Sequence, residues 1–418
     1  MGSWFANLRS GMPPSARSKL GHFTLIAVGI VLAFLLRWTV VDVETGDYTW
    51  SLSGWYDHLR AHGFRGFKDH FSDYSPPYLY LLWMATWLPL KKIAAIKLIS
   101  VVFDFVLATV VSRMVAVVHP RHGLAQAAAF FAVLFAPSVV LNGSVWGQCD
   151  AIYASFAVAS VWLVSKGRRV WPILLLGIAL SFKQQAIFLL PALTIYAMKR
   201  QVSRVALALL PLPFFLLAIP TVCAGRPLKE LLLVYVEQAG HSDELSRGAV
   251  NFYHWIPQAP PALFANFGVV LTLSMLFFLA SACLLSRATF TPRLSLLIGL
   301  ESVMLSVFLL PRMHERYFFV ADVLSIVYAF YRPQRFWIAI LVVSASALSY
   351  LNFALGMYPV PVPYLAFLML TALVAVSRDV VTDLFPAPPP GDGFCNLTST
   401  PEAPTASALG SAGESARL

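Results

Sequence analysis

Long runs of apolar residues, separated by short polar segments, dominate the chain. Twelve runs come close to the roughly 20 helical residues that cross a hydrocarbon layer of about 30 Å. They cover residues 20–41, 93–118, 123–142, 151–165, 170–182, 186–199, 204–222, 266–286, 293–311, 317–331, 336–355 and 362–377. A further apolar piece, 76–90, is shorter, bounded by prolines and rich in Trp and Tyr, which is typical of an interfacial or re-entrant helix. The pattern predicts an all-α polytopic membrane protein with about twelve transmembrane helices.

Basic residues in the short loops predict the orientation of these helices. Basic clusters occur after every second span, so all of them lie on one side of the membrane: 166–169, 199–204, 287–293 and 332–335. The positive-inside rule assigns that side to the cytoplasm. Counting back places the N-terminus inside and the first loop, 42–92, outside, provided that 76–90 does not cross. Most of the unusual polar residues then lie outside.

The same count divides the chain into parts. Residues 1–19 form a cytoplasmic N-terminus, 20–222 a membrane module that includes the outer loop 42–92, 223–265 a large outer loop, and 266–377 the C-terminal transmembrane helices. The tail, 378–418, is rich in Pro, Ser, Thr, Ala and Gly. We expect it to be disordered, because it holds too few apolar residues to pack.

Composition narrows the class of protein. Hydrophobic residues make up 58% of the chain and charged residues only 12%, so lipid is the expected solvent for most of it. The formal charge of +10 falls between apolar runs, which indicates cytoplasmic loops rather than nucleic-acid binding. The four cysteines are widely spaced and no His pair has metal-ligand spacing, so we expect neither a disulfide framework nor a metal site.

Three carboxylates gather where the first apolar run ends. Asp42, Glu44 and Asp47 fall within six positions, although charges are scarce elsewhere. Trp50, Trp55, Tyr56 and Leu59 follow at a helical spacing, which predicts a short amphipathic helix holding the acids at the headgroup level. The alternative is that these acids are simply a solvated helix end.

Several other polar residues interrupt apolar sequence. Asp73 and Tyr74 precede two prolines, and Gln148 and Asp150 precede the run 151–165, where Asp150 suits the positive end of a helix. Lys183, followed by Gln184, has no acid beside it in sequence. An ionisable group there is a functional candidate, although simple capping by the acids and snorkelling by the lysine compete with that interpretation.

The densest charged cluster between apolar runs is Pro311–Tyr317. It contains Arg312, His314, Glu315 and Arg316 at one junction between spans. On the outer face, two arginines and a histidine predict an anion site that could hold a phosphate. In a cytoplasmic loop the same residues would be an ordinary basic anchor. The loop 223–265 adds further polar residues, among which the sequence favours none.

Taken in order, six motifs resemble those of a known superfamily. They are Gly46-Asp47-Tyr48, Asp73-Tyr74-Ser75-Pro76-Pro77, Lys97-Leu98 with Asp104, Gly147-Gln148 with Asp150, Phe182-Lys183-Gln184 and His314-Glu315-Arg316. The order is similar to that in the dolichyl-phosphate-glucose-dependent glucosyltransferases and their bacterial mannosyltransferase-like relatives, within the GT-C superfamily. The inserted Ser75, and Gly147-Gln148 in place of His-Phe-Gln, favour a bacterial-type member.

The resemblance implies an integral-membrane hexosyltransferase of GT-C type, with interfacial helices in its first outer loop. Asp47 would be the catalytic base. Lys183, His314, Arg316 and Arg312 would bind the donor phosphate, with supporting or substrate-binding roles for Asp73, Tyr74, Gln148, Asp150, Gln184, Glu315 and Glu44. The donor would be a polyprenyl-phosphate sugar, and the acceptor a glycan, a lipid-linked glycan or a protein. No cofactor is implied.

Two other classes of function are open at this point. A transporter or lipid-linked glycan flippase also carries ionisable residues among about twelve spans, but typically shows an internal repeat and midplane charges, neither of which is evident here. A non-catalytic scaffold would leave the acids and the basic cluster without a purpose. We therefore expect a monomeric enzyme in a bacterial plasma membrane, or the endoplasmic reticulum membrane if eukaryotic, with an extracytoplasmic active site.

Overall fold

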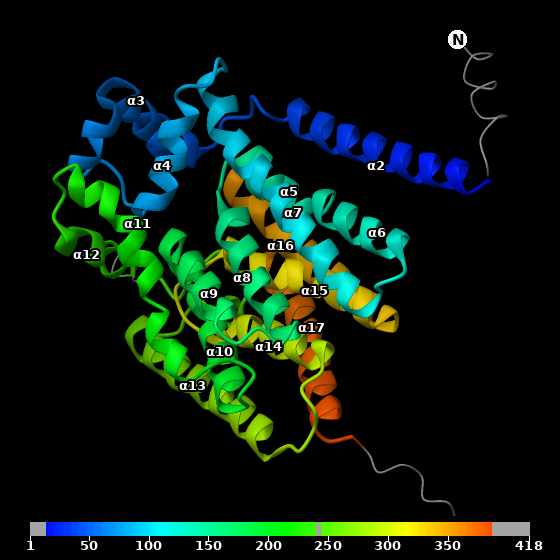
Figure 1. The fold of residues 1–418 in the computed structure, drawn as a ribbon. Helices are drawn as coiled ribbons and strands as arrows, with labels where there is room; N and C mark the ends of the chain where they lie inside the picture. Colours follow the sequence, from blue (N-terminus) through cyan, green and yellow to red (C-terminus); the bar gives the residue numbers. More distant parts are fainter. Residues whose placement is uncertain (1–13, 240–243, 387–418) are drawn as a thin grey trace, which may run out of the picture. The chain divides into compact units, whose positions relative to one another are not determined.

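The computed structural model describes residues 14–239 and 244–386, which are mostly helical (Figure 1). The α-helices are α2 (Pro14–Thr39), α3 (Ser53–His62), α4 (Pro76–Ala85), α5 (Lys92–Val118), α6 (Gly123–Leu134), α7 (Pro137–Val140), α8 (Asp150–Ser165), α9 (Trp171–Phe182), α10 (Leu190–Met198), α11 (Leu212–Cys223), α12 (Leu228–Ala239), α13 (Pro261–Leu285), α14 (Pro292–Leu309), α15 (Phe319–Tyr331), α16 (Phe336–Leu355) and α17 (Val362–Leu384). Shorter 3₁₀ or π segments are η1 (Tyr48–Leu52), η2 (Gly63–Lys68), η3 (Leu141–Trp146), η4 (Gln184–Leu189), η5 (Val205–Leu209), η6 (Phe252–Trp255), η7 (Glu315–Phe318) and η8 (Pro333–Arg335). Strands β1 (Ser246–Arg247) and β2 (Met313–His314) pair in parallel.

The structure is that of an all-α membrane protein. Among the described residues, six helical segments are long and apolar enough to cross a membrane: Lys92–Val118, Val205–Cys223, Pro261–Leu285, Pro292–Leu309, Pro333–Leu355 and Val362–Leu384. A seventh is obtained if Gly123–Leu134 and Pro137–Trp146, which meet at 47°, form one broken span. Each of the twelve predicted apolar runs is helical, but several are short, so the number twelve stays a prediction.

The first loop contains two short helices, α3 and α4. With ten residues, α4 is about 15 Å long, half the thickness of the hydrocarbon layer. The buried side chains of α3, including Tyr56 and Leu59, belong to an aromatic-rich core shared with α4 and α5. Trp50 does not join this face, because it lies in η1 and is 82% exposed. The single amphipathic stripe predicted from Trp50 to Leu59 is therefore wrong.

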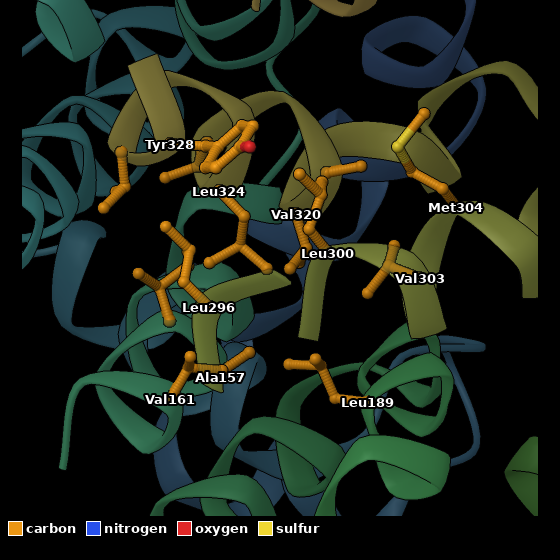
Figure 2. Close-up of a cluster of buried hydrophobic side chains, with 14 of the residues drawn as sticks. Ala157, Val161, Leu189, Leu296, Leu300, Val303, Met304, Val320, Leu324 and Tyr328 are labelled. Atoms are coloured by element: carbon orange, nitrogen blue, oxygen red, sulfur yellow. The ribbon is translucent and has the colours of Figure 1, made fainter. Parts of the chain in front are cut away.

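The main hydrophobic core surrounds α14, which contacts α8, α10, α13, α15 and α17. Leu296, Leu300 and Met304 of α14 meet Val320 and other side chains of α15 and α8 (Figure 2). Its apolar residues cover the whole circumference of the helix, which suits a helix enclosed by others. By contrast, α13 leaves much of its apolar surface exposed, as expected of a helix that faces lipid.

The C-terminal boundary differs from the sequence prediction. Residues 378–384 continue α17, so the prediction that the disordered tail starts at 378 is wrong. The cause is Asp379, which accepts hydrogen bonds from Tyr328 Oη and Arg335 Nη2, each at 2.6 Å, and pairs with Arg332. These contacts fasten the end of α17 to α15 and η8. The compact unit of the chain ends at residue 385. The rest of the predicted tail, residues 387–418, lies outside the described residues.

Candidate functional site

Asp47 lies immediately before η1 and joins the first loop to the segment 141–150. Its Oδ2 accepts a hydrogen bond from Trp146 Nε1 at 2.9 Å and another from Gln148 Nε2. The hydroxyl of Thr45 donates to the carbonyl oxygen of Trp146 at 2.9 Å, which holds the two backbones together. No hydrogen bond to Asp47 Oδ1 is found among the described residues. One carboxylate oxygen is thus held while the other is available.

The segment 141–150 forms a tight turn that presents three functional side chains. The π segment η3 ends at Gly147, whose φ of +83° lies in the left-handed region that favours glycine. The backbone N–H of Gln148 donates to Asn142 O at 2.9 Å, and Ser100 Oγ donates to Gln148 O at 2.7 Å. This turn directs Trp146 and Gln148 toward Asp47, and Asp150 begins α8.

Asp150 and Lys183 form a buried ion pair. Lys183 occupies the extended residue between α9 and η4, and its Nζ donates to Asp150 Oδ1 at 2.6 Å and to Gln148 Oε1 at 3.0 Å. Asp150 Oδ2 accepts a hydrogen bond from Asn142 Nδ2 at 2.7 Å. The third N–H of Lys183 reaches the sulfur of Cys149, a weak acceptor that a stronger one such as a phosphate oxygen could replace. The acid that the lysine lacks in sequence is supplied across the fold.

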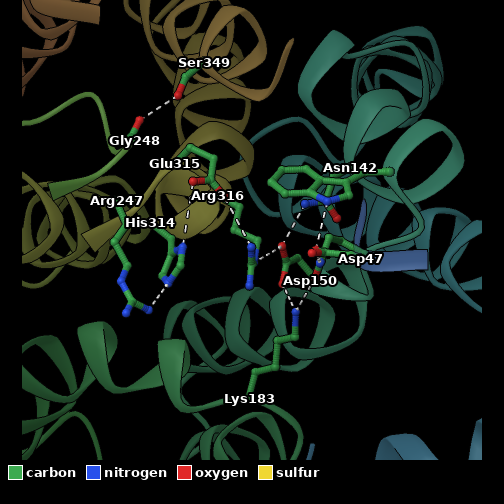
Figure 3. A network of polar contacts seen from close by, with 12 residues as sticks. Asp47, Asn142, Asp150, Lys183, Arg247, Gly248, His314, Glu315, Arg316 and Ser349 are labelled. Atoms are coloured by element: carbon green, nitrogen blue, oxygen red, sulfur yellow. Dashed lines mark hydrogen bonds and ion pairs between the residues drawn. The ribbon is translucent and has the colours of Figure 1, made fainter. Parts of the chain in front are cut away.

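Arg316 extends this network from η7 (Figure 3). Its Nη1 donates to Glu315 Oε1 at 3.2 Å, and its guanidinium lies 5.4 Å from the centre of the Trp146 ring. Its Nε lies 3.9 Å from Asp150 Oδ2, too far for a hydrogen bond, and has no other partner among the described residues. The neighbouring carboxylates, Glu315 foremost, outweigh burial and raise the pKa of Arg316. The guanidinium is charged and retains a buried donor.

His314 connects the network to the loop that follows α12. It lies on β2 beside β1, where Arg247 Nη1 donates to His314 Nε2 at 3.2 Å. Burial and the charges of Arg316 and Arg247 lower the pKa of His314, although Glu315 opposes them. Because Arg247 occupies Nε2 with a donor, the neutral ring carries its proton on Nδ1, which faces Glu315 Oε2 at 3.8 Å.

Asp73 and Tyr74 approach the site from the turn before α4. Tyr74 Oη donates to Gln148 Oε1 at 3.1 Å, and the ring of Tyr74 lies 5.1 Å from Lys183 Nζ. Burial raises the pKa of Tyr74 and also that of Asp73, where the positive charges of Lys183 and Arg316 act in the opposite direction. Asp73 is therefore close enough for the charges of the network to change its pKa.

Two charged residues that resembled family motifs serve as braces. Lys97 Nζ donates to Val43 O at 2.6 Å and to Val145 O at 2.9 Å, so it ties the first loop to η3. Asp104 pairs with Arg37 at 2.9 Å, which links α5 to the end of α2. Both contacts position the segments that carry Asp47 and Trp146.

The structure leaves some predicted residues apart from this network. Glu44 and Arg312 are exposed, and Arg312 has a positive φ of 65° with its backbone N–H bonded to Leu245 O. Gln184 is half-buried at the start of η4, and within the described residues no side-chain hydrogen bond or ion pair joins it to the network. Asp42 forms an exposed ion pair with Lys91 at 3.4 Å. Only Asp47 of the three clustered acids enters the site.

The site also contains residues that sequence reasoning did not select. Asn142 ends an apolar run, and Trp146 lies in the polar segment before Asp150, but neither was selected as a site residue. Arg247 was one of many polar residues in a loop, and only its strand pairing with His314 identifies it. In the part of the chain that the structure describes, no three His, Cys, Asp or Glu side chains are grouped to hold a metal ion.

The network brings opposite charges together in the interior of a largely apolar protein. The carboxylates of Asp47, Asp150 and Glu315 face the cations of Lys183 and Arg316 within one set of contacts. Such an arrangement offers a proton acceptor at Asp47, an unpartnered N–H donor on Arg316, and the charge of Lys183, whose third N–H is held only by the weak acceptor Cys149. No protein-family model matches the sequence, and no curated protein matches it.

Proposed function

We propose that the protein is an integral-membrane glycosyltransferase. It transfers a hexose, mannose or glucose, from a polyprenyl-phosphate-linked donor to an acceptor hydroxyl, by inverting single displacement with Asp47 as the base. The observation that carries this proposal is the hydrogen-bonded connection from Asp47, through Gln148, to Lys183, with Arg316 beside it. A carboxylate and two cations in one network are the groups that such a reaction needs.

The chemistry assigns a task to each group. A lipid phosphate is already a good leaving group, so its departure needs charge neutralisation rather than a proton. The third N–H of Lys183 and the unpartnered Nε of Arg316 would supply it. The acceptor hydroxyl needs a base on the opposite face of the sugar, which is the role of Asp47 Oδ1, and a single displacement then inverts the anomeric centre.

Neutral His314 would contribute a hydrogen bond rather than a charge. Its proton on Nδ1 is held near Glu315, while Arg247 occupies Nε2. The expected role of His314 as a cation for the donor phosphate is therefore revised. Arg312, whose side chain is exposed, is the weakest of the four candidates for binding that phosphate. The proposal therefore rests on Lys183 and Arg316.

The proposal includes the architecture and the setting. The protein would be of GT-C type with about twelve transmembrane helices, α3 and α4 lying at the interface, and a monomeric enzyme with its site on the extracytoplasmic face. The Gly147-Gln148 sequence favours a bacterial plasma membrane. Donor and acceptor would be a polyprenyl-phosphate sugar and a glycan, lipid-linked glycan or protein.

The test is transfer of radiolabelled sugar from short-chain polyprenyl-phosphate-mannose and -glucose in membranes that contain the protein. Asp47→Asn should lower the transfer rate by about 10²–10⁴-fold, the usual contribution of a general base. Asp42→Asn is the matched control, because Asp42 is an exposed acid of the same loop and should leave the rate unchanged.

Two results would contradict the proposal. Wild-type transfer by a normally expressed Asp47→Asn variant would remove Asp47 from the role of base. Failure of both donors, together with uptake of sugar or movement of a lipid-linked glycan in proteoliposomes, would identify a transporter or flippase instead.

A further inference from the structure

A cavity adjoins the polar network on the side of His314. It has a volume of about 490 Å³ and lies among β1, β2, α16 and the start of α17. This volume falls within the range of roughly 300–1,000 Å³ that is common for small-molecule sites. Glu315 and His314 line the cavity and also belong to the network of Asp47 and Arg316. The two sites therefore share a wall.

Asn352 of α16 lines this cavity with an unsatisfied amide. The residue is 9% exposed, and neither its Nδ2 nor its Oδ1 has a hydrogen-bond partner among the described residues. A buried amide without partners is costly, because it has given up its hydrogen bonds to water. An amide that can donate two hydrogen bonds and accept two suits a ligand with adjacent hydroxyl groups.

The rest of the lining has the character of a carbohydrate site. Ser349 Oγ donates to Gly248 O at 2.9 Å, which joins α16 to the end of β1 (Figure 3). Phe353 and Tyr358 are exposed aromatic residues in the lining, and an aromatic ring can pack against the C–H face of a pyranose. Mostly apolar and aromatic walls with a few oriented polar groups are typical of specific ligand sites.

The cavity is separated from Asp47 by aromatic side chains. The ring of Phe353 lies 5.1 Å from that of Trp146, centre to centre, and Trp146 Nε1 donates to Asp47 Oδ2. The rings of Phe353 and Trp146 thus both lie between a ligand in the cavity and the candidate base.

We propose that this cavity binds an uncharged hexose unit of the acceptor, with Asn352 as its main hydrogen-bonding residue. The assignment to the acceptor rests on the proposed function. A neutral ligand is favoured because the lining carries both signs of charge, with Arg247 against Glu244 and Glu315, and so favours neither an anion nor a cation. The amide of Asn352, the hydroxyl of Ser349 and the imidazole of His314 are uncharged groups for its hydroxyls.

Equilibrium dialysis of the detergent-solubilised full chain against tritiated mannotriose and maltotriose tests this inference. At least one of these neutral trisaccharides should bind the wild-type protein. Asn352→Leu should weaken that binding about tenfold or more, because sugar hydroxyls would be buried without partners. The matched control is Asn266→Ala, since Asn266 is an exposed amide on α13 outside the cavity, and should bind like wild type.

Tyr358→Ala provides a second variant that does not depend on the folding of α16, because the tyrosine is exposed. It should also weaken trisaccharide binding. Absence of binding to wild type, or binding that both variants leave unchanged, would overturn the inference and leave the transfer test of Asp47 unaffected. Conversely, binding with the expected pattern would stand even if no sugar were transferred, and would then assign the cavity to sugar recognition alone.

Discussion

Replacing Lys183 with methionine tests the ion pair at the centre of the site. Lys183 Nζ lies 2.6 Å from Asp150 Oδ1, and the two side chains are 7% and 1% exposed. Without the lysine, Asp150 keeps the amide of Asn142 and the more distant Arg316, at 3.9 Å. Removing one partner of a buried pair leaves an uncompensated charge, so the free energy of unfolding should fall by about 3–5 kcal/mol.

Adding Asp150→Asn to this variant should recover half or more of the loss, because the stranded charge is then removed. The measurement is a double-mutant cycle on the free energy of unfolding, from titration of mixed micelles with dodecyl sulfate. The exposed pair of Lys91 and Asp42 is the control, with an expected coupling of at most about 1 kcal/mol. Losses at Lys183 and Asp150 that add within about 0.5 kcal/mol would refute the pairing.

The same cycle separates stability from function. If Lys183 also neutralises the donor phosphate, the variant with both Lys183→Met and Asp150→Asn should regain stability without regaining transfer. Transfer that returns together with stability would assign Lys183 a purely structural role.

Three further outcomes are expected. Trp146→Phe removes one donor to Asp47, the candidate base, and transfer should fall about tenfold, the equivalent of 1.4 kcal/mol; an unchanged rate would argue against this contact. Gly268→Ala would force a Cβ against the hydroxyl of Tyr253 and should lower the free energy of unfolding by about 1–3 kcal/mol, whereas adding Tyr253→Phe should restore part of it. Burial lowers the pKa values of His254 and His314 in the folded protein. As the pH falls, these histidines therefore take up protons in the unfolded chain before they do so in the folded one, and the free energy of unfolding should decrease below about pH 6.5. Replacing both histidines with glutamine should flatten that decrease in unfolding measured between pH 7 and 5, and an unchanged slope would contradict it.

Several site residues could be predicted because their position in the sequence was itself unusual. Asp47, Asp150, Lys183 and Arg316 are ionisable residues at the ends of apolar runs, where an unpaired charge is costly. Glu44 and Arg312 were also predicted to join this cluster, but both are exposed in the structure, where a charge costs little and needs no partner. Sequence spacing does not distinguish a buried charge from an exposed one.

The local sequence determined the helices of this protein. Apolar runs ended by prolines, glycines and basic residues become helices because each backbone group must find its hydrogen bond within the segment when water is absent. The apolar runs did not predict where each helix ends. In α17, contacts of Asp379 with α15 and η8 extend the helix past the end of its apolar run.

Only the tertiary structure decided which charges meet. Lys183 and Asp150 are 33 positions apart, and Asp47 and Gln148 are 101 apart, so no periodicity relates them. Their distances depend on how α5, α8, α9 and α14 pack, and that packing arises from many apolar contacts rather than from the polar residues themselves. The composition of the chain therefore determined a helical membrane protein, while the fold assembled its candidate site.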